Sequence, residues 1–133
     1  MLAMSNLDLY GVNFIKAGTA INTDTRVNGA DFKIDKQYKK AKGVVYLFVK
    51  NEEVLYIGVT EREILQRMNM YSSNTTGSTN CKMRANLKTD GKYDIYIHIA
   101  DTVRVGDLQA TNELTVEKCL IQHMTPKYNK KVM

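Results

Sequence analysis

The sequence has few of the residues that stabilise small secreted proteins, and it lacks a long apolar run. Its 133 residues include two cysteines, one proline and no tryptophan. Two cysteines do not form a disulfide framework, so we expect reduced thiols and a cytoplasmic location. No stretch approaches the roughly 18 apolar residues of a membrane-spanning helix. Residues 1–10 show no basic segment followed by an apolar block, so no signal peptide is expected.

A glycine-rich phosphate loop, an internal repeat and a low-complexity tract are also missing. Gly77 and Gly91 stand alone in polar turns. The hydrophobic fraction of 44% and the charged fraction of 25% are ordinary for a soluble globular protein. At this length we therefore expect a single domain with a core of its own.

Positive charge is in modest excess, with a formal net charge of +5. The lysines and arginines gather in three stretches, at residues 33–42, 82–92 and 127–131. Three basic clusters on one small domain favour a polyanionic partner. Any one of them taken alone is typical of a solvated surface.

The middle of the chain carries the clearest secondary-structure pattern. Residues 44–49 and 54–59 are apolar strands joined by a short polar turn, which predicts an antiparallel hairpin. Thr60 and Glu63 then have the spacing of a capping box, which predicts a helix from Thr60 to about Tyr71. Residues 82–87 suggest a basic helix, residues 93–99 alternate as a strand, and Glu113–Met124 form a last helix before Pro126.

This order, β-β-α-α-β-α, predicts an α+β fold with a central three-stranded antiparallel sheet flanked by helices. Residues 1–42 contain short β-prone segments and are expected to be an N-terminal β-containing extension that packs on the core or assembles it. Residues 43–133 would form the main domain, with a polar and basic insertion at 72–92.

One acidic residue, Glu117, lies in the apolar stripe of the last helix. At 100° per residue, Leu114, Leu120, Ile121 and Met124 fall within about 60° of it. An ionised carboxylate among apolar side chains is costly unless a cation, a metal ion or several donors meet it. Glu117 is therefore a candidate metal ligand or catalytic acid, and a structural ion pair with an arginine is an equally weighted alternative.

Other polar residues recur at informative intervals. Tyr46 and Tyr56 lie ten residues apart on the two strands of the hairpin, which brings them near each other across the ladder. Gly58 thins the second strand at a point where another group must approach the backbone closely. Arg67 and Tyr71 are four residues apart and share one helix face.

These residues resemble, in type, order and spacing, those of the GIY-YIG nuclease superfamily, and the resemblance covers residues 43–129. The two short motifs of that family correspond to residues 44–46 and 56–58. Its arginine, the aromatic residue one turn later, its glutamate and its late asparagine correspond to Arg67, Tyr71, Glu117 and Asn129. Each short motif is weak alone, so the combination carries the resemblance.

Within this family the layout is most similar to that of small standalone phage enzymes. If the chain is phage-encoded, the expected location is the cytoplasm of the bacterial host cell. One departure from the family is Val59, where lysine is frequent, so another cation would have to replace that charge.

The resemblance implies a metal-dependent DNA endonuclease that leaves 5′-phosphate and 3′-hydroxyl ends. Glu117 would hold one Mg²⁺ (or Mn²⁺) ion per active site. Tyr46 would accept a proton from the attacking water or orient it, and nearby cations would have to favour its ionised form. Tyr56 and Tyr71 would support Tyr46, and Arg67 would neutralise charge on the phosphate. Asn129 would orient the region of Glu117 through a hydrogen bond.

DNA is the expected partner. Lys82, Arg84 and Lys88 of the insertion would hold its phosphates. An enzyme with one active site cuts one strand, so cleavage of both strands would require a homo-oligomer, a dimer or a tetramer.

Two other interpretations stay open. The basic clusters and exposed tyrosines can also describe a non-catalytic nucleic-acid-binding module, which would show affinity without turnover. Cys81, His98, Cys119 and His123 are possible zinc ligands. However, they lack the short spacing of zinc sites, and Cys119 is expected to point away from the apolar stripe.

Overall fold

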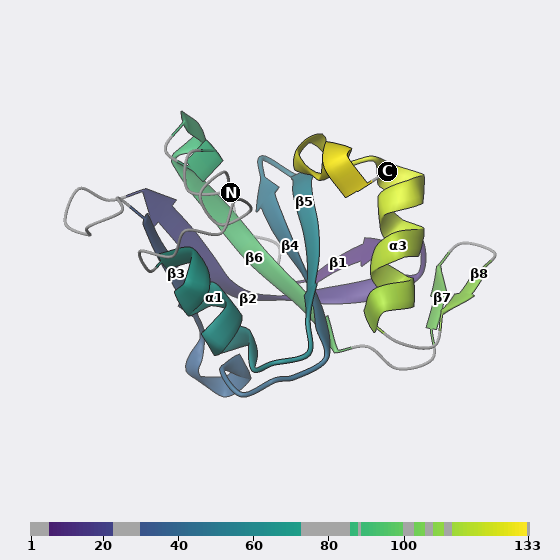
Figure 1. Cartoon of the computed structure of the whole chain (residues 1–133), viewed down its shortest axis with the longest axis horizontal. Helices are drawn as coiled ribbons and strands as arrows, with labels where there is room; N and C mark the ends of the chain where they lie inside the picture. Colours follow the sequence, from purple (N-terminus) through teal and green to yellow (C-terminus); the bar gives the residue numbers. More distant parts are fainter. Residues whose placement is uncertain are drawn as a thin grey trace.

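The computed structural model describes residues 6–22, 30–72, 86–87, 89–99, 103–105, 108–110 and 113–132. The strands are β1 (Asn6–Leu9), β2 (Val12–Asn22), β3 (Ala30–Ile34), β4 (Val44–Lys50), β5 (Glu53–Thr60), β6 (Lys92–Ile99), β7 (Val103–Val105) and β8 (Leu108–Ala110). The helices are α1 (Ile64–Ser72) and α3 (Glu113–Met124), with the 3₁₀ turns η1 (Lys36–Tyr38) and η2 (Lys127–Val132). Figure 1 shows their arrangement.

β4 and β5 form the hairpin predicted from their apolar runs, with Val44 opposite Thr60 and Lys50 opposite Glu53. Asn51 and Glu52 make the turn, with φ angles of 51° and 68°. Positive φ at both central positions is the geometry that matches the right-handed twist of a tight hairpin.

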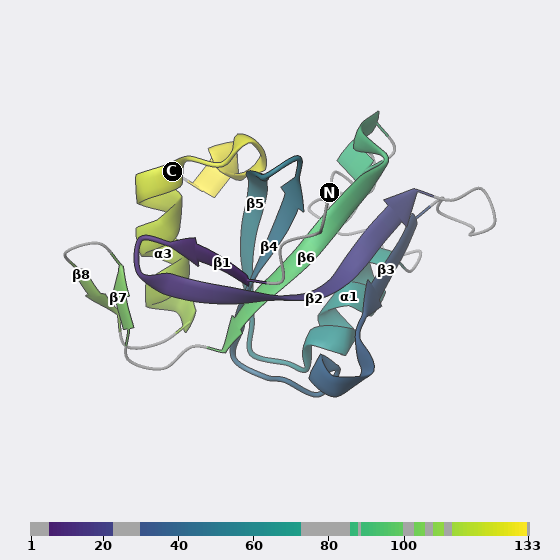
Figure 2. The same ribbon diagram turned by 180° about the vertical axis from the view of Figure 1, so that it is seen from behind.

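The prediction of a three-stranded sheet is wrong, although the α+β class is compatible with the structure. β6 pairs with β4, but its other edge pairs with β2, so the sheet has six strands in the order β1-β2-β6-β4-β5, with β3 also on β2. In Figure 2 the long β2 crosses the sheet. The N-terminal strands thus belong to the same sheet as the hairpin.

The sequence conceals β2 because its alternation is interrupted. A bulge between Lys16 and Gly18 shifts its register against β6, and such a bulge moves the apolar side chains to the other face. Gly18 is a weak strand former, yet a Cβ there would lie 2.0 Å from the Lys33 carbonyl oxygen of β3. The close approach of two backbones therefore requires glycine where propensity argues against a strand.

Two apolar clusters cover the two faces of the sheet, because side chains of β4 alternate between them. Tyr46 and Phe48 belong to one cluster, together with Ile64, Met68 and Tyr71 of α1.

Leu47 belongs to the second cluster, together with Leu120 and Ile121 of α3. Figures 1 and 2 show α1 beside β3 and α3 at the other end of the sheet, beside β5.

The helix α1 begins later than the capping box predicts. Thr60 ends β5, and its hydroxyl accepts a hydrogen bond from the Arg62 amide at 3.1 Å. The first amides of α1 are satisfied by other backbone instead: Ile64 N donates to Ala41 O at 2.8 Å, and Leu65 N donates to Lys39 O at 3.2 Å. A distant segment thus replaces the side-chain cap.

α3 has the predicted bounds, Glu113–Met124. The Thr125 amide donates to Ile121 O at 2.8 Å, and Thr125 has a positive φ of 43°, which turns the chain before Pro126. The following turn, η2, returns along β5. No helix among the described residues is long and apolar enough to cross a membrane.

Candidate active site

Tyr46 of β4 and the pair Arg67 and Tyr71 of α1 form a closed hydrogen-bonded triangle. The two hydroxyl oxygens of Tyr46 and Tyr71 are 2.8 Å apart. Arg67 donates from Nε to the Tyr46 hydroxyl at 3.1 Å and from Nη2 to the Tyr71 hydroxyl at 3.0 Å. Both tyrosines are buried and Arg67 is half-buried. The predicted helical spacing puts Arg67 and Tyr71 on the same face of α1, and this face meets Tyr46 of β4.

Tyr56 of β5 lies beside this triangle. Its ring centroid is 6.3 Å from that of Tyr46, and its ring stacks on Phe48 at 5.7 Å. The Tyr71 hydroxyl is near enough to Tyr56 to lower the pKa of that phenol, although burial outweighs this effect. Gly58 is opposite Tyr46 in the ladder. The three predicted tyrosines thus share one side of the sheet.

The environment keeps the phenols protonated. Burial raises the pKa of Tyr46, the nearby Tyr56 adds to the effect, and the charge of Arg67 opposes it without reversing it. Burial likewise raises the pKa of Tyr71 and of Tyr56. Among the protein groups, desolvation outweighs the charge of the Arg67 guanidinium at Tyr46.

Arg67 remains a cation in this setting. Burial alone would lower its pKa, but Tyr46 and Tyr71 raise it above the ordinary value. Its guanidinium carbon also lies 4.3 Å from the centroid of the Tyr71 ring. The site therefore holds a fixed positive charge among neutral phenols.

Glu117 lies near Tyr56 at the edge of the sheet. β5 is the last strand, α3 packs beside it, and Glu117 is one turn before the buried Leu120 and Ile121. The side chain is half-buried. Its charge is close enough to Tyr56 to raise the pKa of that phenol.

The surroundings of Glu117 disfavour the ionised form of its carboxyl group. Burial raises its pKa, and the neighbouring Lys118 opposes the shift only in part. Among the described residues, no hydrogen bond or ion pair joins Glu117 to another side chain. Arg67 donates hydrogen bonds to the two phenols Tyr46 and Tyr71.

Asn129 binds the backbone of β5 through its side-chain amide. Its Oδ1 accepts from the Ile57 amide at 2.8 Å, and its Nδ2 donates to the Ile57 carbonyl at 2.9 Å. Both bonds are buried. An amide side chain thus pairs with the strand between Tyr56 and Gly58.

Lys82, Arg84, Lys88 and Cys81 lie outside the described residues. In the part of the chain that is described, no three His, Cys, Asp or Glu side chains gather as a metal site.

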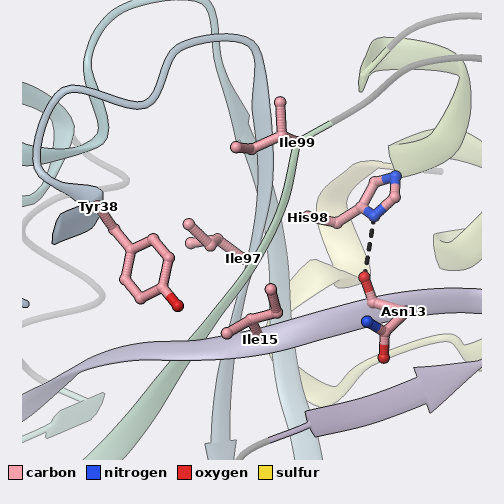
Figure 3. A pocket seen from close by; sticks show the side chains of 6 residues that line it. All are labelled: Asn13, Ile15, Tyr38, Ile97, His98 and Ile99. Carbon is pink, nitrogen blue, oxygen red and sulfur yellow. Dashed lines mark hydrogen bonds between the residues drawn. The ribbon is translucent and has the colours of Figure 1, made fainter.

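The other suggested zinc ligands, His98, His123 and Cys119, make separate contacts. His98 donates from Nδ1 to the Asn13 carbonyl at 2.9 Å beside a groove of about 280 Å³ (Figure 3). His123 donates from Nδ1 to the Cys119 carbonyl at 2.9 Å. Cys119 packs against the second apolar cluster, so the expectation that it points away from the apolar stripe is wrong.

Sequence reasoning missed a second polar cluster, centred on Asp90. The hydroxyls of Tyr93 and Tyr128 both donate to Asp90 Oδ2 at 2.6 Å. The spacing of Asp90 and Tyr93 across a turn before a strand was a weak local signal. The contact with Tyr128 spans 38 residues and had none.

No protein-family model and no curated protein matches this sequence. Among the solved structures with the same fold are two endonucleases. One is the restriction endonuclease HPY188I in complex with product DNA, with a TM-score of 0.58 and 16% identity over 89% of this chain and 75% of that one.

The other is a mutant form of bacteriophage T4 EndoII, with a TM-score of 0.59 and 22% identity over 87% of this chain and 90% of that one. Together they show that this chain shares its fold with two DNA-cutting enzymes, one of which comes from a bacteriophage.

Proposed function

We propose that the protein is a metal-dependent DNA endonuclease of the GIY-YIG type. The observation that carries the proposal is the triangle of Arg67, Tyr46 and Tyr71, with Tyr56 beside it. The half-buried Glu117 lies near enough to Tyr56 to raise the pKa of that phenol. A fixed cation, hydroxyl donors and a carboxylate are the groups that phosphodiester hydrolysis uses. The endonuclease fold of the two structural neighbours supports the same chemistry.

Tyr46 would orient the attacking water as a neutral phenol. When Tyr71 donates to Tyr46, the Tyr46 oxygen accepts from both Tyr71 and Arg67, and its own hydrogen can point to a water or to a phosphate oxygen. The raised pKa of Tyr46 favours this role over proton abstraction in the resting site.

Arg67 would stabilise the charge that grows on the phosphate. It is held by two phenol oxygens, which fix the plane of the guanidinium before DNA arrives. A charged donor that needs no reorganisation is most effective in a partly desolvated site.

The residues present fit a single divalent cation at Glu117. A half-buried carboxylate that no described side chain neutralises is stabilised by a positive ion, and Mg²⁺ or Mn²⁺ is commonly held by one carboxylate and several waters. When bound, such an ion would neutralise charge on the scissile phosphate and on the departing 3′ oxygen. Glu117 would be the protein ligand.

DNA would be the partner, with Lys82, Arg84 and Lys88 contributing phosphate contacts and a homo-oligomer needed to cut both strands. Residues 1–42 would act as an extension of the catalytic domain, residues 43–133. The products would carry 5′-phosphate and 3′-hydroxyl ends.

Incubation of supercoiled plasmid with the protein in Mg²⁺ or in EDTA tests the proposal. We expect nicked or linear DNA only with the metal ion, and nicks that DNA ligase reseals without prior end treatment. Cleavage that continues in EDTA would reject the metal ion. Tight binding with no cleavage in either buffer would favour the binding module instead.

A further inference from the structure

Asp90 is hydrogen-bonded to three other parts of the chain, through its carboxylate and its backbone carbonyl. Tyr93 at the start of β6 and Tyr128 in η2 both donate to its Oδ2 at 2.6 Å. At the end of β4, Lys50 Nζ donates to the Asp90 backbone carbonyl at 2.6 Å. Asp90 thus fixes η2 against the ends of two central strands.

The protonation states of Asp90 and of the two tyrosines strengthen the hydrogen bonds that hold η2. Burial would raise the pKa of Asp90, but the hydrogen bonds from Tyr128 and Tyr93 and the charge of Lys50 hold it below the ordinary value. Burial and the bond to Asp90 raise the pKa of Tyr128 to about 12. At neutral pH, an ionised acceptor therefore meets neutral donors, which is the stronger form of such a bond.

The residue after Tyr128 is Asn129, whose two buried hydrogen bonds hold Ile57 of β5. β5 is an edge strand, so Asn129 takes the place of a further strand along this stretch. Ile57 lies between Tyr56 and Gly58, and these two residues contact the ring of Tyr46 or face it directly. A small displacement of β5 would therefore also displace the side chains of Tyr56 and Tyr46.

We propose that Asp90 and Tyr128 are positioning residues for phosphodiester hydrolysis. Their hydrogen bond holds η2 in place, so that Asn129 keeps β5 in register and Tyr56 and Tyr46 stay aligned. This inference rests on the proposed function of the site, because its catalytic part requires that the site cuts DNA.

The chain offers a matched pair of variants. Tyr128→Phe and Tyr93→Phe each remove one hydroxyl bonded to the same Asp90 oxygen and keep the ring, but only Tyr128 belongs to the segment that carries Asn129. For Tyr128→Phe we expect kcat to fall about tenfold with little change in KM or in DNA affinity, as when the support of a reactive group is lost. Tyr93→Phe should change kcat by less than about twofold. Equal effects of the two variants would overturn the proposal.

A readout without DNA separates this inference from the proposed function. Amide hydrogen exchange at Ile57, followed by NMR, should accelerate in Tyr128→Phe and in Asn129→Ala but not in Tyr93→Phe. Unchanged exchange at Ile57 in Tyr128→Phe would overturn the positioning route even if kcat falls. A native protein that cuts no DNA would overturn the proposed function and the catalytic part here, while the exchange result would still decide whether Tyr128 holds β5.

Discussion

The ring of Tyr46 fills the space that a side chain at Gly58 would need. A Cβ at position 58 would lie 2.4 Å from Tyr46 Cζ and 2.5 Å from its hydroxyl oxygen. Both residues are buried and face each other across the β4–β5 ladder. Gly58 of β5 therefore leaves the space that the ring of Tyr46 on β4 occupies.

Gly58→Ala should displace Tyr46 and break its bonds to Arg67 and Tyr71. We expect a large loss of nicking activity and a loss of stability of about 1–3 kcal/mol, typical of an overpacked core. Chemical denaturation and a plasmid nicking assay measure the two effects. In the double variant Tyr46→Ala, Gly58→Ala the stability losses should not add, because the clash is gone. Strict additivity would contradict the packing argument.

Arg67→Ala should impair cleavage while sparing DNA affinity. Arg67 is held against two phenols and is expected to act on the reacting phosphate, so we expect the rate to fall by about 10²–10³-fold. Fluorescence anisotropy with labelled DNA should show only a small change in Kd. Arg62→Ala removes the same charge from an exposed position nearby and is the control. Comparable rate losses in both variants would argue against a specific role.

Replacing Glu117 should stabilise the metal-free protein at neutral pH. Burial raises the pKa of this carboxyl in the folded state, so the ionised form costs stability, and the cost disappears as the pH falls and the group protonates. In EDTA, Glu117→Gln should therefore unfold at a higher temperature than the native protein at pH 7, and the gap should close toward pH 4. Glu61→Gln, at an exposed position, serves as the control. A lower melting temperature for Glu117→Gln at pH 7 would contradict the account.

Lys82→Ala should weaken DNA binding and make the binding less dependent on salt concentration. A phosphate contact releases counterions, so its loss should lower the slope of log K against log salt by about one unit. Anisotropy titrations between low and moderate salt measure this slope. An unchanged slope would remove Lys82 from the DNA-binding surface.

The parts of the fold that were predictable are those set by local patterns. These local patterns are the apolar runs of β4 and β5, the alternation of β6 and the end of α3 before Pro126. Each depends on only a few neighbouring residues, and each element is present in the structure. The spacing of Arg67 and Tyr71 likewise follows from one helical turn.

The parts that were missed depend on distant contacts. β2 pairs with β6, which lies between 71 residues (Ile21 to Lys92) and 82 residues (Ile15 to Ile97) later in the chain. β2 also contains a bulge and a glycine, so its sequence pattern is weak until its partner strand is known. The start of α1 is set by Lys39 and Ala41 rather than by Thr60.

The same reason explains which features of the site the sequence did not reveal. Asn129 binds Ile57, 72 residues earlier, and spacing gives no hint of that partner. The raised pKa of Tyr46 follows from burial under α1, which outweighs the one cation that the sequence shows nearby.

The most direct test of the central claim is the plasmid nicking rate of Glu117→Gln at saturating Mg²⁺, compared with the native protein at matched DNA occupancy. If Glu117 holds the metal ion beside the phenols and Arg67, the rate should fall about 10³-fold, or about 4 kcal/mol in barrier. A rate within about tenfold of the native value, with binding unchanged, would contradict the account.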